Sequence, residues 1–177
     1  PGCCVSKPEE GIQMFFGAVE KSPQTDRAGK YLQETFEAGG CHASFEDDVR
    51  VLLWKKAITN SGYNAVCTVT RLRLHFVMEN DWGMKLLMNV WKEGCAVAKA
   101  LGVGDIWPLI EGDIENLREN LGDYYPSMAQ DAVIHHRRTE INVLNGAIAR
   151  YGERLGVPTP YNSVLADIVS CVQDNYN

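Results

Sequence analysis

A lysine and two asparagines recur at intervals of four residues in one apolar stretch of the sequence. Lys56, Asn60 and Asn64 lie in a segment, from near Asp47 to about Thr70, whose pattern predicts a helix. A step of four residues rotates an α-helix only about 40° past a full turn, so the three side chains share one face. Such a row of donors suits a cleft for an oxygen-rich small molecule. A solvated face or a hydrogen-bonded seam between helices is the alternative that spacing alone leaves open.

A carboxylate and a hydroxyl follow in the second half of the chain. An apolar stripe predicts a helix from Thr139 to Leu155, with Glu140 in its first turn. The helix dipole favours an acid there whatever the function. Ser127 follows Pro126 and is a residue type that caps helices. Both side chains therefore have a structural explanation beside a chemical one.

The elements that must position these residues are mainly helical. Capping residues, prolines and glycines predict where helices begin and end. The predicted helices run from just after Ser22 to Gly39, from near Asp47 to Thr70, and over Asp81 to Gly102, Asp105 to Leu121, Thr139 to Leu155, and Tyr161 to Val172. Methionine and tryptophan side chains recur at helical spacing between residues 84 and 98, which predicts core packing. Residues 11–19 form a short apolar, aromatic run bracketed by glycine, typical of a strand. A single strand cannot bury both faces, so we expect it to belong to a sheet made largely by other residues.

Composition narrows the class of protein. The chain has 177 residues, a formal net charge of -6 and no long basic block, which argues against nucleic acid as the main partner. The basic cluster His135 to Arg138 is short and predicts a solvated turn or helix start. No apolar run reaches the roughly 18 to 20 residues of a membrane span, and no signal pattern opens the chain. The chain starts at Pro1, which suggests a piece of a longer protein.

The cysteines indicate a reducing compartment. They are scattered, without CxxC spacing or clustered histidines, and comprise Cys3, Cys4, Cys41, Cys67, Cys95 and Cys171. We therefore expect reduced thiols in a cytoplasmic protein and no metal site.

Three blocks of sequence resemble the C-terminal domain of the ketopantoate reductase (2-dehydropantoate 2-reductase) family. Trp54 to Asn64 is similar to that family's Trp-x-Lys-x-x-x-Asn-x-x-x-Asn block. Ser127-Met-Ala-Gln-Asp131, with Thr139-Glu-Ile-Asn-Val-Leu-Asn-Gly146, resembles its Ser-Met-x-Gln-Asp and Thr-Glu-Ile-Asp-x-x-Asn-Gly pair. Leu155 to Asn162 is similar to its closing Gly-x-x-x-Pro-x-Asn. The order and approximate spacing of the three blocks argue against a chance match. The resemblance covers nearly the whole chain.

The resemblance implies a mainly α fold, a helical 6-phosphogluconate dehydrogenase C-terminal-like domain preceded by a short β remnant of a Rossmann domain. Residues 1–21 would be the end of the NADP-binding domain, and residues 22–177 the helical substrate-binding domain. The implied enzyme is an NADPH-dependent 2-keto acid reductase of pantothenate and coenzyme A biosynthesis. Its partners would be the keto acid and its own N-terminal Rossmann domain, with no nucleic acid and no membrane.

The resemblance also assigns roles to individual residues. Lys56 would be the general acid near the substrate ketone, and Glu140 would bind a substrate hydroxyl or orient the lysine. Asn60 and Asn64 would hydrogen-bond the substrate, and Ser127 would bind near its carboxylate. No GxGxxG occurs in the chain, so NADPH would be bound mainly by a domain that these residues lack, and the fragment alone would be inactive. Apolar surface left by that domain could promote self-association.

Two positions depart from the family pattern and bear on the substrate. Tyr124 stands where many members have a substrate-contacting asparagine, and Leu74 where another asparagine is common. The interval from Met128 to Glu140 is also one residue longer than the commonest form. Two alternatives therefore stay open: another β-hydroxyacid-type dehydrogenase, and a non-catalytic helical interaction domain whose polar residues form a seam.

Overall fold

A computed structural model describes residues 13–120 and 123–176, which fall into two compact units. The first extends through Leu52 and the second begins at Leu53. Each is described by itself. Within the described residues, no helix combines the length and the apolar character needed to cross a membrane.

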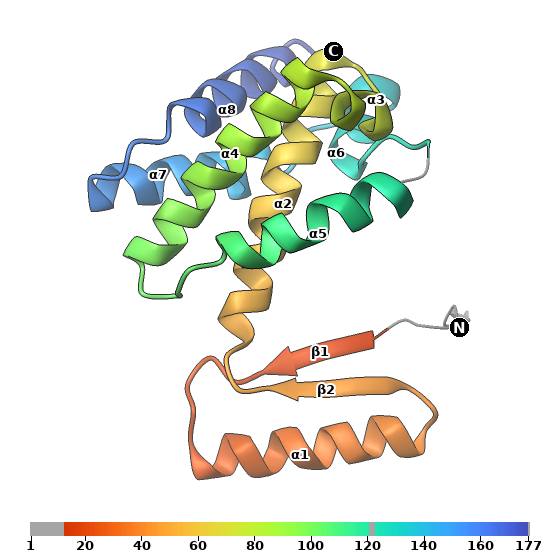
Figure 1. Ribbon diagram of the computed structural model, residues 1–177, viewed down its shortest axis with the longest axis vertical. Coiled ribbons are helices and arrows are strands. Elements are labelled where there is room, and N and C mark those ends of the chain that lie inside the picture. Colours follow the sequence, from red (N-terminus) through yellow and green to blue (C-terminus); the bar gives the residue numbers. More distant parts are fainter. Residues whose placement is uncertain (1–12, 121–122, 177) are drawn as a thin grey trace. The chain divides into compact units, whose positions relative to one another are not determined.

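The first unit is a β-α-β arrangement. Strand β1 (Gln13–Gly17) pairs in parallel with β2 (His42–Glu46), in a register that sets Gln13 opposite His42. Helix α1 (Pro23–Ala38) connects the two strands and runs along them in Figure 1. Parallel strands need such a crossover because a tight turn cannot join them. The unit is the short β-containing part expected before the helices.

Aromatic rings join α1 to the two strands. The ring centroid of Phe16 lies 6.1 Å from that of Phe36 and 5.9 Å from that of Phe45. Gly29 lies against the same cluster, since a Cβ there would come within 2.3 Å of the Phe45 ring. The predicted start of α1 is confirmed, because Ser22 caps it through the Thr25 amide at 3.1 Å.

The unit is longer than its sequence suggested. The sequence placed a boundary after residue 21, whereas the structure groups α1 and β2 with β1 as far as Leu52. The reason is the pairing of β2, a strand not predicted from the sequence. Strand β2 is only five residues long, and its sequence offers just Ala43 and Phe45 as apolar residues between polar His42, Ser44 and Glu46, so its alternation is too short to stand out as a strand signal.

The second unit is helical throughout its described residues and is built on α2 (Val49–Thr70), whose first residues belong to the β-α-β unit. The remaining elements are α3 (Leu74–Glu79), α4 (Asp81–Ala100), α5 (Trp107–Asn120), α6 (Ser127–Ala129), the π-helical turn η1 (Gln130–Ile134), the 3₁₀ turn η2 (Ile141–Val143), α7 (Asn145–Leu155) and α8 (Pro160–Gln173). The expected helix ends near Thr70, Gly102 and Val172 agree with these bounds to within two residues. Helix α3 was not predicted.

Helices α2 and α4 approach each other closely at a glycine on each. A Cβ on Gly62 would lie 2.1 Å from the Trp91 indole nitrogen, and one on Gly94 would lie 2.9 Å from Ile58. The Trp91 nitrogen donates to the Thr59 carbonyl oxygen at 3.2 Å. Trp91 is fully buried, and the other residues of the predicted methionine and tryptophan stripe are buried in the core or pack against it. The prediction that the stripe is core is therefore confirmed.

The helix predicted from Thr139 to Leu155 is wrong in its first turn. The structure has the short η2 turn and then α7, which begins only at Asn145. Leu144 interrupts the helix with φ -102° and ψ -95°. The side chain of Ile141 is fully buried in the core. This burial, and not the start of α7, fixes the path of the η2 turn. Glu140 therefore lies outside the helix, and the helix-dipole explanation for an acid there no longer applies.

Candidate functional site

The three polar side chains predicted to share a face do lie on one continuous helix. Helix α2 contains Lys56, Asn60 and Asn64, here called the polar row. Exposure falls along the row from Lys56, which is exposed, through the half-buried Asn60 to Asn64, which is 3% exposed. The row thus runs from solvent into the interior of the helical unit, which argues against a uniformly solvated face and fits both a cleft wall and a seam between helices.

Two further side chains on this face were not singled out from the sequence. Tyr63 is seven residues after Lys56, about two helical turns, and Cys67 follows one turn later. Burial raises the pKa of Tyr63 to about 12, and nearby Tyr124 adds a smaller rise. A phenol with this pKa stays neutral and can both donate and accept a hydrogen bond. The signal in the sequence was the period of 3.6, which places positions seven apart on the same face.

Lys55 and Lys56 are adjacent on α2, but only Lys55 forms an ion pair among the described residues. Lys55 pairs with Asp113 of α5 at 2.5 Å and so fastens α2 to that helix. Among the described residues, Lys56 has no ion-pair partner, and no ion pair joins it to Glu140. The structure therefore shows an unpaired amine at the solvent end of the polar row, while the expected link to Glu140 stays a proposal.

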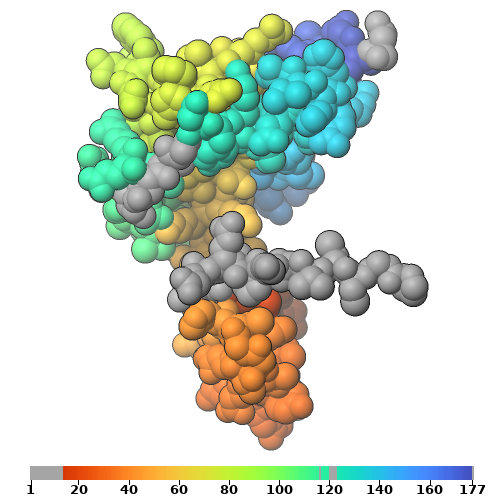
Figure 2. Space-filling view, turned by 90° about the vertical axis from the view of Figure 1, so that its right-hand side faces the viewer, coloured from red at the N-terminus to blue at the C-terminus, as the bar shows by residue number. Residues whose placement is uncertain are grey.

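Glu140 is half buried and its backbone is held on both sides. Its carbonyl oxygen accepts from the amides of Val143 at 2.9 Å and Leu144 at 3.2 Å. The residue before it, Thr139, donates its amide and its hydroxyl to the Gln173 side-chain oxygen at 2.9 and 3.0 Å. Figure 2 shows the cyan residues of this part of the chain lying against the blue end of α8.

Ser127 is the first residue of α6 and is exposed. Pro126 occupies the cap position, so the capping role that Ser127 could have had is not what the structure shows. Met128 and Ala129 are fully buried and anchor the short helix. The hydroxyl is therefore displayed at the surface by a well-packed turn, available to a ligand.

A buried amide network explains two motif residues whose roles were not predicted. Asn145 donates to the Ser61 carbonyl oxygen at 3.0 Å and to the Asn162 side-chain oxygen at 3.1 Å. Asn162 in turn donates to Glu93 at 2.8 Å and to the Val90 carbonyl oxygen at 3.1 Å. Both asparagines are fully buried. The network ties α7 and α8 to α4 and to the middle of the polar row on α2, which is a structural task.

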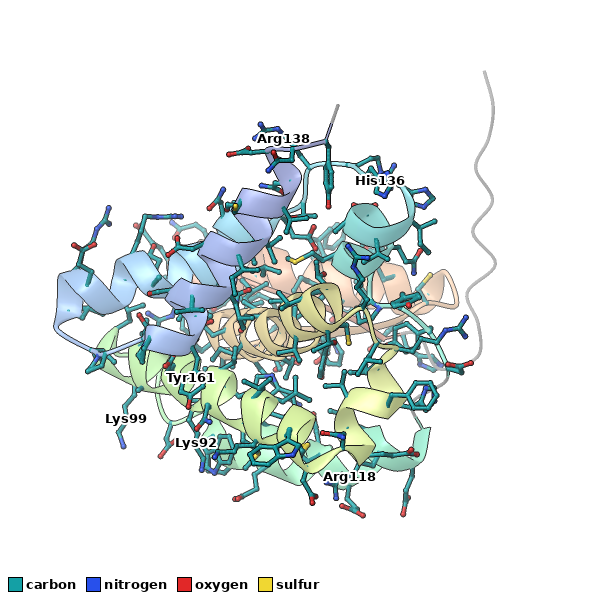
Figure 3. All side chains as sticks on the ribbon, turned by 90° about the horizontal axis from the view of Figure 1, so that it is seen from above. Lys92, Lys99, Arg118, His136, Arg138 and Tyr161 are labelled. Atoms are coloured by element: carbon teal, nitrogen blue, oxygen red, sulfur yellow. The ribbon has the colours of Figure 1, made fainter. Side chains whose placement is uncertain are left out.

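The basic cluster lies where the sequence predicted, on a solvated turn after η1. Residues 135–138 are all exposed. Arg137 pairs with Asp131, and Arg138 pairs with Asp174 at 3.0 Å. Figure 3 shows Arg138 and His136 at the edge of the helical unit, directed away from its interior. The cluster is therefore no part of the polar row.

The architecture of the two units indicates the class of protein to which the chain belongs. A helical unit built on one long helix, which follows a short unit with two parallel strands in the chain, agrees with the mainly α fold expected from the sequence. The family model described as ketopantoate reductase PanE/ApbA C terminal matches residues 48–173, and the chain belongs to this family.

Sequence comparison agrees over most of the chain. The 2-dehydropantoate 2-reductase of Streptococcus pyogenes serotype M3 is 29% identical over 147 residues, which are 83% of this chain and 48% of that protein. The chain thus spans about half the length of the curated relatives it matches.

Solved structures with the same fold include a dehydrogenase and a reductase. D-mandelate dehydrogenase in a ternary complex with NADH and anilino(oxo)acetate has a TM-score of 0.83 and 28% identity, covering 93% of this chain and 68% of that one. A PanE/ApbA family ketopantoate reductase from Ralstonia eutropha JMP134 has a TM-score of 0.76 and 30% identity, covering 94% of this chain and 53% of that one.

Proposed function

We propose that the protein containing this chain reduces 2-dehydropantoate, or a close 2-keto acid, to the 2-hydroxy acid with NADPH, in the route to pantothenate and coenzyme A. The observation that carries the proposal is the polar row, in which the family's lysine and both asparagines occupy one face of α2. The reaction would take place in the cytoplasm.

The residues of this chain would bind the substrate and manage one proton. Reduction of a ketone places negative charge on its oxygen, and the Lys56 ammonium would stabilise that charge and deliver the proton. Asn60 and Asn64 are neutral, so they can hold hydroxyl and carbonyl oxygens without competing for the proton. The exposed Ser127 hydroxyl would bind near the carboxylate, and Glu140 would orient Lys56 or bind a substrate hydroxyl.

The described residues do not fit a dinucleotide. The connection between β1 and α1 contains no glycine, and the first turn of α1 is capped by its own Ser22 side chain. A pyrophosphate site at a helix N-terminus needs glycines for close backbone approach and free amides. NADPH, which supplies the hydride, would therefore be held by an N-terminal Rossmann domain outside this chain, and that domain would be its principal partner.

A second substrate class is favoured by a specific observation. Tyr124 stands where many family members have an asparagine, and it is near enough to Tyr63 of α2 to raise the pKa of that phenol. Two phenol rings suit a flat apolar substituent better than a hydroxylated one. Because D-mandelate dehydrogenase shares the fold, an aryl-substituted 2-keto acid is the alternative substrate.

Steady-state kinetics of the full-length protein would decide between these substrates. The assay would follow NADPH oxidation with 2-dehydropantoate, with phenylglyoxylate and with a short aliphatic 2-keto acid. The proposal expects the highest kcat/KM for 2-dehydropantoate. A preference for phenylglyoxylate would establish the alternative, and no turnover of any 2-keto acid would refute both.

A further inference from the structure

We propose that Gln173, the last residue of α8, is a positioning residue for Glu140. The inference rests on the proposed function, in which the Glu140 carboxylate acts beside the substrate. It concerns how that carboxylate is held, since Glu140 lies outside any α-helix and precedes the η2 turn.

Gln173 is an unusual residue for its position because it is polar and only 4% exposed at the end of a helix. Its side-chain oxygen accepts two hydrogen bonds from a single residue, the amide and the hydroxyl of Thr139. The Thr139 hydroxyl oxygen also accepts weakly from the Ile141 amide at 3.4 Å. One buried oxygen atom thus fixes the residue before Glu140 directly and helps to fix the residue after it.

The rest of the connection has no comparable anchor on this side. Residues 135–138, which lead into Thr139, are all exposed. Their ion pair to α8, between Arg138 and Asp174, is itself exposed, and such pairs contribute little to stability or order. On the other side the chain enters the core at Ile141. Glu140 therefore sits between one buried polar anchor and one buried apolar anchor.

An amide is well suited to this position because it accepts the two hydrogen bonds without adding charge beside Glu140. Removing the acceptor would leave the Thr139 amide without its partner and let the backbone at residue 140 move. A displacement of about 1 Å of a catalytic group can reduce a rate by about 100-fold. The fall would be in kcat rather than in KM if substrate binding depends mainly on the polar row of α2.

The test compares kcat and KM for the full-length protein and its Gln173→Met variant, which keeps the size of the side chain and removes the acceptor. We expect kcat to fall about 10- to 100-fold with little change in KM. Thr139→Val removes the hydroxyl with its bond to Gln173 and its weak bond from the Ile141 amide, but keeps the bond from the Thr139 amide to Gln173, and should give a smaller loss. Asp174→Asn, one residue further on, breaks the exposed ion pair and should leave kcat unchanged.

A double-mutant cycle separates positioning from general destabilisation. If Gln173 acts through Glu140, Gln173→Met has almost no further effect on kcat once Glu140 is alanine, because the two losses share one cause. Equal effects with and without Glu140 would overturn the inference, as would an unchanged kcat in both Gln173→Met and Thr139→Val. Should Glu140→Ala itself leave kcat unchanged, the catalytic role of Glu140 in the proposed function fails and the inference with it.

Discussion

Tyr63 and Cys67 make the face of α2 around the polar row more apolar than its amides suggest. The Cys67 thiol is fully buried, and burial raises its pKa to about 12. The same holds for the Cys95 thiol of α4, whose pKa is also raised to about 12 by burial. At neutral pH these groups are uncharged, so any charge near the row comes from Lys56 and the acids around it.

The buried Cys67 thiol predicts a loss of stability in alkali. Its pKa is higher in the folded chain than its ordinary value of 9.0, so the folded state holds the proton longer. The stabilisation is full below about pH 9 and is lost as the pH rises towards 12, because only the unfolded chain ionises there. We expect the thermal unfolding midpoint of Cys67→Ala to fall less steeply over this range than that of the unsubstituted chain. Equal slopes would contradict this, and the exposed Cys171→Ala serves as control.

The sequence alone predicted which side chains share a face of a single helix, but not which side chains form hydrogen bonds between helices. Lys56, Asn60 and Asn64 could be placed together because the helical repeat alone puts them on one face. The network of Asn145, Asn162 and Glu93 could not, because its partners are 17 and 69 residues apart along the chain. No local pattern encodes such a contact.

At the scale of elements, helix ends were predictable wherever a cap or a glycine marks them. Ser22 begins α1, and Gly102, at φ +75°, follows the end of α4. The start of α7 was missed because the apolar stripe continues through Ile141, although that side chain belongs to the separate η2 turn. Strand β2 was missed because an alternation of only five residues is a weak local signal, and the strand forms through its pairing with β1.

Two glycine substitutions should have opposite effects on stability, because Gly62 lies where α2 and α4 approach closely and Gly112 of α5 does not. Gly62→Ala places a methyl group 2.1 Å from the Trp91 indole nitrogen and should destabilise the chain by about 1–3 kcal/mol through overpacking. Gly112→Ala, within α5, meets nothing within 4 Å and should stabilise by about 0.5–1 kcal/mol. Urea denaturation of both variants measures the difference. A Gly62→Ala variant as stable as Gly112→Ala would show that the helices are not packed as described.

At the scale of the whole molecule, the proposed function gives the chain the substrate-binding residues and leaves the dinucleotide to another domain. The chain matches about half of its relatives' length, and the connection between β1 and α1 contains no glycine. The general division into a short β-containing part and a helical part followed from the sequence. The position of the division did not, because it depends on the pairing of strand residues that lie 29 positions apart along the chain.

This division predicts that the 177-residue chain alone cannot turn over substrate. Mixed with NADPH and 2-dehydropantoate, it should oxidise no NADPH if, as proposed, the residues that hold the cofactor belong to another domain. The full-length protein at the same concentration provides the comparison. Turnover by the isolated chain at a rate close to that of the full-length protein would contradict the assignment of the cofactor to another domain.

The most direct measurement is the kcat of full-length protein carrying Lys56→Ala beside that carrying Lys55→Ala. The two lysines are neighbours on α2, but Lys55 is paired with Asp113 and Lys56 is not. If Lys56 delivers the proton, its loss lowers kcat by about 10²- to 10⁴-fold, while Lys55→Ala lowers stability slightly and leaves kcat within about twofold of the parent. Equal kcat values in the two variants would contradict the central role of Lys56.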